Sequence, residues 1–359
     1  MTVTAAKSTG EAGIKTLDDF TTNKSTDSGY AGNTIISNGD GTFQWTVGET
    51  LVPTNPASAT GTHQCIVAGY HTGYSSDISL KSFSSNATGI TYGRTNGTQG
   101  NMNMGVTSQG TDLIAAGGAR TGYQITIWQK VFTSSSHQAS YGELTQNMGH
   151  MGATSSPDDM MFSGSSISTR DTISAKAYSS SSNATAFGTL LQGRYGHLFE
   201  SDDNDAVVIG GSNNSGSPLY KTLKEKWAFN DYSTITGWGH ITEDRSECYC
   251  GSDGATIGYV AGFYHGGDST YFRLSAGAKS AYASSSDIFT WGSLSATRAQ
   301  GGGSSDSTNI LCSAGKLEGF NNATTSELWS LTNNSAATSW GGMTANSGYQ
   351  GAGAASGNG

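Results

Sequence analysis

Apolar and polar residues follow two kinds of pattern along most of the chain. Segments such as Tyr123–Val131 alternate between apolar and polar positions, which is typical of β-strands. Segments such as Ala206–Ile209 are short apolar runs that end at a glycine pair. We find no convincing helix in the sequence. The pattern therefore predicts an all-β protein.

These predicted strands recur with a regular spacing, and two glycine landmarks mark it. The first landmark, called the anchor glycine below, follows a large side chain. The first and last anchors are 293 positions apart over six intervals, so the period is about 49 residues. The second landmark, usually a small residue followed by glycine, comes 21 to 24 residues after an anchor. The anchors are Gly48, Gly93, Gly142, Gly188, Gly239, Gly292 and Gly341, and the second landmarks end at Gly69, Gly117, Gly164, Gly210, Gly262 and Gly315.

Each repeated unit is predicted to form four strands, as in one blade of a β-propeller. The innermost strand follows the anchor and is small and polar, as at Arg245–Gly251 and Arg298–Ser304, because little room exists near the axis. Second strands are predicted at Gln64–Val67, Asp112–Ala115, Met160–Phe162, Ala206–Ile209, Ile257–Val260 and Asn309–Cys312. Third strands are predicted at Ile78–Phe83, Tyr123–Val131, Thr172–Tyr178, Leu219–Trp227, Tyr271–Ala276 and Glu327–Leu331.

Seven anchors predict seven blades, one of which both ends of the chain must share. Residues 1–51 contain no whole unit, and only 18 residues follow Gly341. An open ring would expose sheet edges, so Thr2–Ala6 is predicted to complete the last blade beside an inner strand near Gly348–Ala355. The expected organisation is one domain over 1–359, with closing strands in 1–51, six complete blades in 52–346 and the closing inner strand in 347–359.

The repeated pattern of tryptophan, glycine, leucine and arginine resembles kelch-type propellers, whose period is roughly 50 residues. It is most similar to the kelch-like repeats of marine and cyanobacterial phage virion proteins, which read aromatic-Gly-[DE]-L-T-x-x-R. The matching residues are Tyr141 to Thr145, Phe187 to Leu190 with Arg194, Trp238 to Thr242 with Arg245, and Trp291 to Leu294 with Arg298. The resemblance covers roughly residues 43–359; Thr54, Gln99, Met148 and Ser347 replace the arginine, and Ser165 replaces a glycine.

This resemblance implies a non-enzymatic virion structural protein, such as a knob, fibre tip or decoration on capsid or tail. Its expected partners are other virion proteins and a host-surface glycan. Composition adds that only 13% of residues are charged and that the net charge is −9, which argues against nucleic acid or an anionic membrane as a partner. The N-terminus has no secretory signal pattern, and no apolar run approaches the ~18 residues of a membrane span.

The sequence offers little catalytic chemistry, and we predict no catalytic residue, metal or cofactor. Four cysteines are too few for a disulfide framework; we interpret them as buried thiols, with a metal or redox role for Cys248 and Cys250 as the alternative. None of the seven histidines forms a metal-binding pair motif. The alternative function is a carbohydrate-active propeller enzyme, either galactose-oxidase-like or a glycan hydrolase.

The expected contact surface is the mouth of the propeller, where the loops between second and third strands emerge. Aromatic side chains in such loops stack on sugars and anchor protein interfaces, although they could instead fill gaps between blades. The candidates are Tyr70, His71, Tyr74, Phe263, Tyr264 and His265. A separate acidic turn at Asp202, Asp203 and Asp205 could bind calcium or remain solvated.

Overall fold

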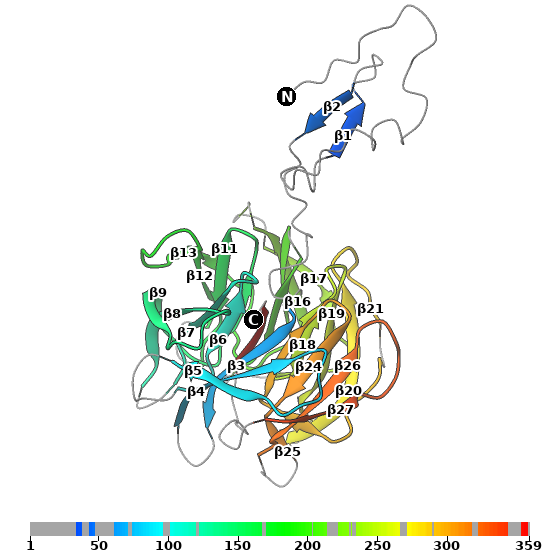
Figure 1. Ribbon diagram of the computed structural model, residues 1–359. Coiled ribbons are helices and arrows are strands. Elements are labelled where there is room, and N and C mark those ends of the chain that lie inside the picture. The colour runs from blue at the N-terminus through cyan, green and yellow to red at the C-terminus, as the bar shows by residue number, and fades with distance from the viewer. Residues whose placement is uncertain are drawn as a thin grey trace, which may run out of the picture. The chain divides into compact units, whose positions relative to one another are not determined.

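The regular structure of the protein consists of β-strands wherever the computed structural model describes the chain (Figure 1). The chain divides into two compact units, Met1–Thr54 and Asn55–Gly359. The described residues are 34–37, 43–46, 61–70, 74–95, 101–119, 122–166, 170–202, 204–213, 222–229, 231, 235–265, 271–288, 291–317, 322–343 and 353–357.

The first unit contains a β-hairpin formed by β1 (Thr34–Ser37) and β2 (Phe43–Thr46). The two strands pair antiparallel in a sheet of two strands, with Ile35 opposite Trp45. The sequence predicts β2, which precedes the anchor Gly48, as the outer strand of a blade. Instead, its only described strand partner is β1, so this anchor does not mark a blade.

The second unit contains six four-stranded antiparallel sheets among its described residues, and we number them as blades 1 to 6. Blade 1 contains β28 (Gly353–Gly357), β3 (His63–Tyr70), β4 (Tyr74–Ser82) and β5 (Ile90–Arg94); blade 2 contains β6 (Gly105–Ser108), β7 (Asp112–Ala116), β8 (Gln124–Val131) and β9 (Ala139–Met148); blade 3 contains β10 (Gly152–Ser155), β11 (Asp159–Ser163), β12 (Thr172–Ala177) and β13 (Thr185–Thr189). Blade 4 contains β14 (Leu198–Ser201), β15 (Asp205–Ile209), β16 (Leu223–Ala228) and β17 (Thr236–His240); blade 5 contains β18 (Tyr249–Ser252), β19 (Thr256–His265), β20 (Tyr271–Ala281) and β21 (Asp287–Ile288); blade 6 contains β23 (Gly302–Ser305), β24 (Asn309–Ser313), β26 (Thr325–Ser330) and β27 (Thr338–Gly342). The short strands β22 (Arg298–Ala299) and β25 (Lys316–Leu317) form a further pair.

The prediction of seven blades is wrong, and the chain closes in a different way from the one expected. The C-terminal strand β28 is present as the predicted inner strand, but it belongs to blade 1, where it pairs antiparallel with β3. The register runs from Gly353 opposite Val67 to Gly357 opposite His63. Blade 1 therefore has its four strands without an N-terminal contribution. The predicted closing strand at Thr2–Ala6 lies outside the described residues.

The hydrophobic core lies between neighbouring blades, which explains the short apolar runs in the sequence. In β7, Leu113 and Ala115 belong to a buried cluster shared with blade 1, whereas Ile114 and Ala116 belong to a cluster shared with blade 3. Alternate side chains of a strand point to opposite faces of its sheet, so both faces of this strand are buried. The six predicted second strands all lie within observed strands, and the predicted third strands all overlap observed ones.

Serines link several neighbouring inner strands around the axis. The serines that end β6, β10, β14, β18 and β23, together with Ser356 of β28, are fully buried. Several of these hydroxyls donate to the backbone carbonyl of the equivalent serine in the preceding blade. These bonds run from Ser108 to Ser356 (2.5 Å), from Ser155 to Ser108 (2.9 Å), from Ser201 to Ser155 (2.6 Å) and from Ser305 to Ser252 (2.8 Å). The links satisfy buried polar groups and hold neighbouring blades together.

The anchor glycines and their aromatic neighbours connect the blades at the outer edge. Tyr141 of blade 2 donates its hydroxyl proton to the carbonyl of Tyr178 in blade 3, and the Lys176 ammonium lies 4.2 Å from the centre of its ring. The anchor Gly142 has φ +117°, and a Cβ there would lie 2.7 Å from the carbonyl oxygen of Ser182. A glycine is therefore required here, because the neighbouring blade occupies the space that a side chain would need.

Replacing Gly142 with alanine is expected to destabilise the propeller by roughly 2–4 kcal/mol, because backbone strain and a clash with blade 3 act together. Gly110→Ala is the matched control. Gly110 also has positive φ, at +78°, but nothing lies within 4 Å of an added Cβ. Its substitution should therefore cost only about 1–2 kcal/mol, the strain contribution. Urea unfolding measures both values, and equal losses would contradict the role assigned to the inter-blade contact.

Two arginines of the repeat, Arg194 and Arg298, lie in buried ion pairs. The sequence predicts that Arg245 and Arg298 begin inner strands, but the inner strands β18 and β23 start only at Tyr249 and Gly302. Arg298 instead binds Glu327 of β26 at 2.5 Å, with both side chains 3% exposed. Arg194 forms the equivalent pair with Glu225 of β16 and also donates to the carbonyl oxygens of Gly210 and Leu223, each at 2.8 Å. These arginines fasten the segment before an inner strand to the third strand.

Candidate functional site

Five residues with left-handed backbone conformation surround the axis just before the inner strands of blades 2 to 6. We call Asn103, His150, Gly196, Glu247 and Gln300 the axial ring; their φ values lie between 53° and 65°. The N–H of each residue after the first donates to the carbonyl of the ring residue in the preceding blade, at 2.7–3.0 Å. Hydrogen bonds of the main chain therefore fix the backbone position of the ring residues.

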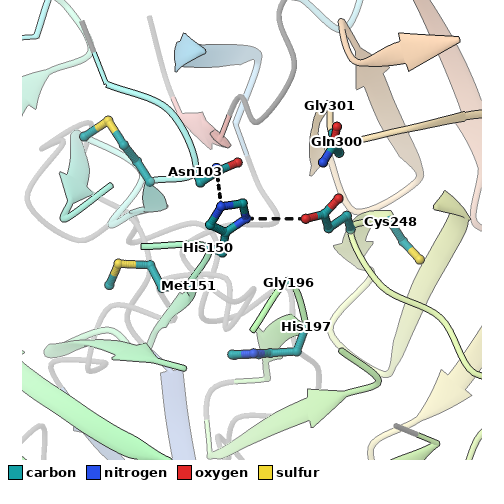
Figure 2. A pocket seen from close by; sticks show the side chains of 10 residues that line it. Asn103, His150, Met151, Gly196, His197, Cys248, Gln300 and Gly301 are labelled. Carbon is teal, nitrogen blue, oxygen red and sulfur yellow. Dashed lines mark hydrogen bonds and ion pairs between the residues drawn. The ribbon is translucent and has the colours of Figure 1, made fainter. Parts of the chain in front are cut away.

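His150 lies at the centre of the side chains that the axial ring directs into the mouth (Figure 2). Its Nε2 lies 2.7 Å from Asn103 Nδ2, and its Nδ1 lies 3.5 Å from Glu247 Oε1. An amide nitrogen only donates, so Nε2 accepts and the ring proton resides on Nδ1, facing the carboxylate. The Tyr195 ring makes a T-shaped contact with the imidazole, with ring centres 5.7 Å apart. Both ring nitrogens of His150 therefore have protein partners.

The axial ring side chains line an open cavity of about 100 Å³. Met104, Met151, His197, Cys248 and Gly301 complete its wall. Within the part of the chain that the structure describes, the side-chain carbonyl oxygen of Gln300 is buried without a hydrogen-bond partner. An orphaned buried acceptor next to a cavity can be satisfied by a ligand or by water. The mouth is therefore the candidate binding site of this propeller.

His197 lies beneath the cavity and is held neutral. It is 6% exposed, and its Nε2 lies 2.9 Å from the Ser163 hydroxyl. Burial, with a smaller contribution from the positive charge of Arg194, lowers the pKa of His197 to about 3. Because an unfolded histidine has a pKa near 6.5, the unfolded state binds one more proton than the folded state between these two values.

The free energy of unfolding is therefore expected to fall as the pH drops from about 6.5 towards about 3, by about 1.4 kcal/mol per pH unit from this group. His197→Gln should remove that contribution while keeping a polar partner for Ser163. The comparison is made by urea unfolding of both proteins at pH 7 and pH 5. We expect the wild type to lose about 2 kcal/mol more than the variant. An equal loss in both proteins would assign the acid sensitivity to other groups.

The candidates predicted from sequence lie in two blades. Tyr70 and Tyr74 are opposite each other at the end of the β3–β4 hairpin of blade 1, and His71 lies outside the described residues. Phe263, Tyr264 and His265 end β19 of blade 5, where they are opposite Arg273, Phe272 and Tyr271. The Arg273 guanidinium lies 5.3 Å from the centre of the Phe263 ring, and the Phe263 N–H donates to Ser246, the residue before Glu247. Phe263 is therefore hydrogen-bonded to the residue that directly precedes Glu247 of the axial ring.

The described side chains of the acidic turn are engaged in hydrogen bonds and an ion pair within the protein. Asp202 Oδ1 accepts the backbone N–H groups of Asn204 and Asp205, and Asp205 pairs with Lys226 at 2.8 Å. Equivalent aspartate turns occur at Asp253 and Asp306, and Asp203 lies outside the described residues. Across the described ranges, no group of three or more His, Cys, Asp or Glu side chains could hold a metal ion. No described helix is long and apolar enough to cross a membrane.

The cysteines are free thiols. Cys65, Cys248 and Cys312 are buried, and Cys250 in β18 is half-buried. Burial raises the pKa of Cys248 to about 12. Cys248 directly precedes the strand that contains Cys250, so the predicted placement of both on one strand is not observed. Buried thiols with raised pKa values agree with the interpretation of these residues as packing groups.

Comparison with known proteins identifies the fold but no family. No family model matches the sequence, and no curated protein matches it. Among solved structures, 358 chains match. One of them, titled "Structure of YjhT", aligns with a TM-score of 0.62 at 10% identity, over 80% of this chain and 99% of that chain. A likeness at this identity concerns the fold alone. Together with the six sheets described above, it shows that the chain is a β-propeller.

Proposed function

We propose that this protein is a non-enzymatic structural component of a bacteriophage virion, a knob, fibre tip or decoration on capsid or tail. Its kelch-like propeller presents the mouth to another virion protein or to a host-surface glycan. The resemblance of the repeats to phage virion proteins, carried by residues such as Trp238-Gly239 with Arg245, supports the assignment. The division of the chain into two compact units suits a protein that attaches through one unit and presents the other.

The observation that carries the proposal is the length of two hairpins at the mouth. The second strands of blades 2, 3, 4 and 6 have 5 residues each, whereas β3 has 8 and β19 has 10. Both long strands pass through a register shift at the second landmark, at Gly69 and Gly262, and then continue to pair. The extensions contain or border all six aromatic and histidine candidates. Continued pairing gives the backbone of the candidates within β3, β4 and β19 a fixed geometry, which suits recognition of a surface.

The rest of the propeller suits a rigid support. Buried serines join the inner strands, and aromatic residues and glycines join the outer edges. Charged groups that could do chemistry are engaged in holding strands together, as in the Arg194–Glu225 and Arg298–Glu327 pairs. Rigid presentation of loops is the mechanism that these contacts support.

The proposal is tested on particles from the source culture, purified on a density gradient. We expect mass spectrometry to find the chain in the particle fraction at a constant ratio to the major capsid protein. Antibodies against residues 55–359 should label particles at a reproducible position by electron microscopy. The chain remaining in the soluble fraction, with unlabelled particles, would overturn the assignment.

One observation favours the alternative, a carbohydrate-active enzyme. An imidazole next to a carboxylate, as in His150 and Glu247, is an arrangement used for general acid–base catalysis. Against it, Asn103 already occupies Nε2, which leaves no ring nitrogen open to a substrate. The purified protein incubated with oligosaccharides, under hydrolytic and oxidative conditions, separates the two functions. Product formation that His150→Ala abolishes would establish the enzyme and contradict the non-enzymatic proposal.

A further inference from the structure

We propose that the axial cavity binds the terminal residue of a neutral glycan. Two adjacent hydroxyl groups of that residue donate hydrogen bonds to Glu247 and Gln300. This inference rests on the proposed function, since it assigns a ligand to the mouth that the propeller presents. Glu247 and Gln300 belong to neighbouring blades and are joined by a backbone hydrogen bond of 3.0 Å. Figure 2 shows the Gln300 side chain on the same cavity as His150.

The cavity has an excess of hydrogen-bond acceptors. Asn103 uses its amide nitrogen on His150, so that its carbonyl oxygen is left for other donors. Glu247 uses one carboxylate oxygen, Oε1, on His150, and its second oxygen makes no hydrogen bond or ion pair within the part of the chain that the structure describes. The Gln300 carbonyl oxygen is buried and unpartnered there. Acceptors of this kind fit a ligand that brings O–H or N–H donors, such as a sugar.

The surrounding charge selects against anionic ligands. An anionic group would meet the Glu247 carboxylate, which lines the cavity. A neutral ligand avoids this repulsion. Two adjacent hydroxyl groups of a sugar match a carboxylate and an amide that lie side by side.

Size and shape point to the end of a glycan rather than to an internal residue. A cavity of about 100 Å³ admits one edge of a sugar ring and leaves the remainder outside. Tyr195 is half-buried and packs against His150, one of the residues that line the cavity. Because the backbone hydrogen bonds of the axial ring fix Glu247 and Gln300 before any ligand arrives, little ordering is required on binding.

The test uses the full chain and defined probes: methyl glycosides of galactose, glucose and mannose, with N-acetylneuraminic acid and glucosamine as charged comparisons. Isothermal titration calorimetry is expected to show saturable, millimolar binding of at least one neutral glycoside. Glu247→Gln and Gln300→Ala should each weaken it about tenfold, the loss expected for one good hydrogen bond. Gln109→Ala is the matched control, because this half-buried glutamine follows β6 at the opposite end of the inner strand and donates a hydrogen bond to the carbonyl of Pro157.

Saturation-transfer NMR on the wild-type protein gives a second measurement that does not depend on whether a variant folds. It should place the protein contacts at adjacent positions of the sugar ring. Absence of saturable binding by every neutral glycoside would overturn the inference, as would binding that both cavity variants leave unchanged. Tighter binding of either charged sugar would overturn the assignment of a neutral ligand. Particle association is measured separately, so glycan binding without particle association would contradict the virion role alone.

Discussion

Deletion of residues 353–359 is expected to abolish the folded propeller, whereas deletion of residues 1–54 leaves its thermal midpoint within a few degrees of the wild type. The first deletion removes β28, five residues paired with β3, and the carbonyl that accepts the Ser108 hydroxyl. It also exposes the inner edge of blade 1. Each hydrogen bond contributes about 1 kcal/mol, and burial of Ala355 and Ser356 adds to this, so the loss approaches the 5–15 kcal/mol that typically separates folded from unfolded states.

Size-exclusion chromatography and thermal unfolding followed by circular dichroism distinguish the two deletions. We expect the C-terminal deletion to elute as aggregate and to lack a cooperative transition. The N-terminal deletion should remain monodisperse, because Met1–Thr54 is a separate compact unit. Equal damage from both deletions would show that an N-terminal segment contributes to closure, as the sequence alone suggests.

Glu225→Gln is expected to destabilise the protein by about 3–5 kcal/mol and to lower its thermal midpoint by roughly 10 °C. Arg194 and Glu225 are fully buried, and burial raises the pKa of Glu225 while Arg194 and two backbone N–H groups lower it. The neutral amide would leave the Arg194 guanidinium buried without its counter-charge. Removing one partner of such a pair costs far more than removing both.

Two variants check this explanation. Glu243→Gln breaks the contact with Arg245, but Glu243 is 51% exposed, so the expected loss is below about 1 kcal/mol. The double variant Arg194→Met with Glu225→Leu should regain most of the stability lost in Glu225→Gln. The role of the unpaired charge would be contradicted if Glu225→Gln lost as little stability as Glu243→Gln. It would also be contradicted if the double variant were no more stable than Glu225→Gln.

The repeat could be recognised from sequence because its glycines are fixed by local geometry. Gly142 and Gly292 have positive φ and lie against a carbonyl of the next blade, so no other residue fits well. Apolar runs such as Asp112–Ala115 are also readable, because both faces of a middle strand are buried. Each unit shows these glycines and apolar runs in its own sequence, so they can be recognised without knowing how the units pair.

The number of blades could not be obtained in the same way. An anchor glycine marks the end of an outer strand, and it carries no information on whether the other strands of that blade exist. Phe43–Thr46 with Gly48 has the local form of such an end, yet this strand pairs with β1. Closure depends on the pairing of β28 with β3, nearly the whole chain length away, and no local pattern encodes it.

The axial ring was missed because its members share a backbone conformation and not a residue type. Asparagine, histidine, glycine, glutamate and glutamine show no common side-chain property. The available signal was positional: His150, Gly196, Glu247 and Gln300 each follow an anchor glycine by eight residues. The sequence directs attention to His150 only as one of seven scattered histidines.

Because main-chain hydrogen bonds hold the axial ring, the binding specificity of the mouth can change independently of the propeller scaffold. Since N–H and carbonyl groups join the ring residues of neighbouring blades, the side chains at its four non-glycine positions can change without removing these main-chain hydrogen bonds. A library restricted to residues that tolerate the left-handed region could therefore retarget the mouth to new ligands. Evolution has the same freedom, so under the proposed function the protein could follow a changing host surface while its scaffold stays constant.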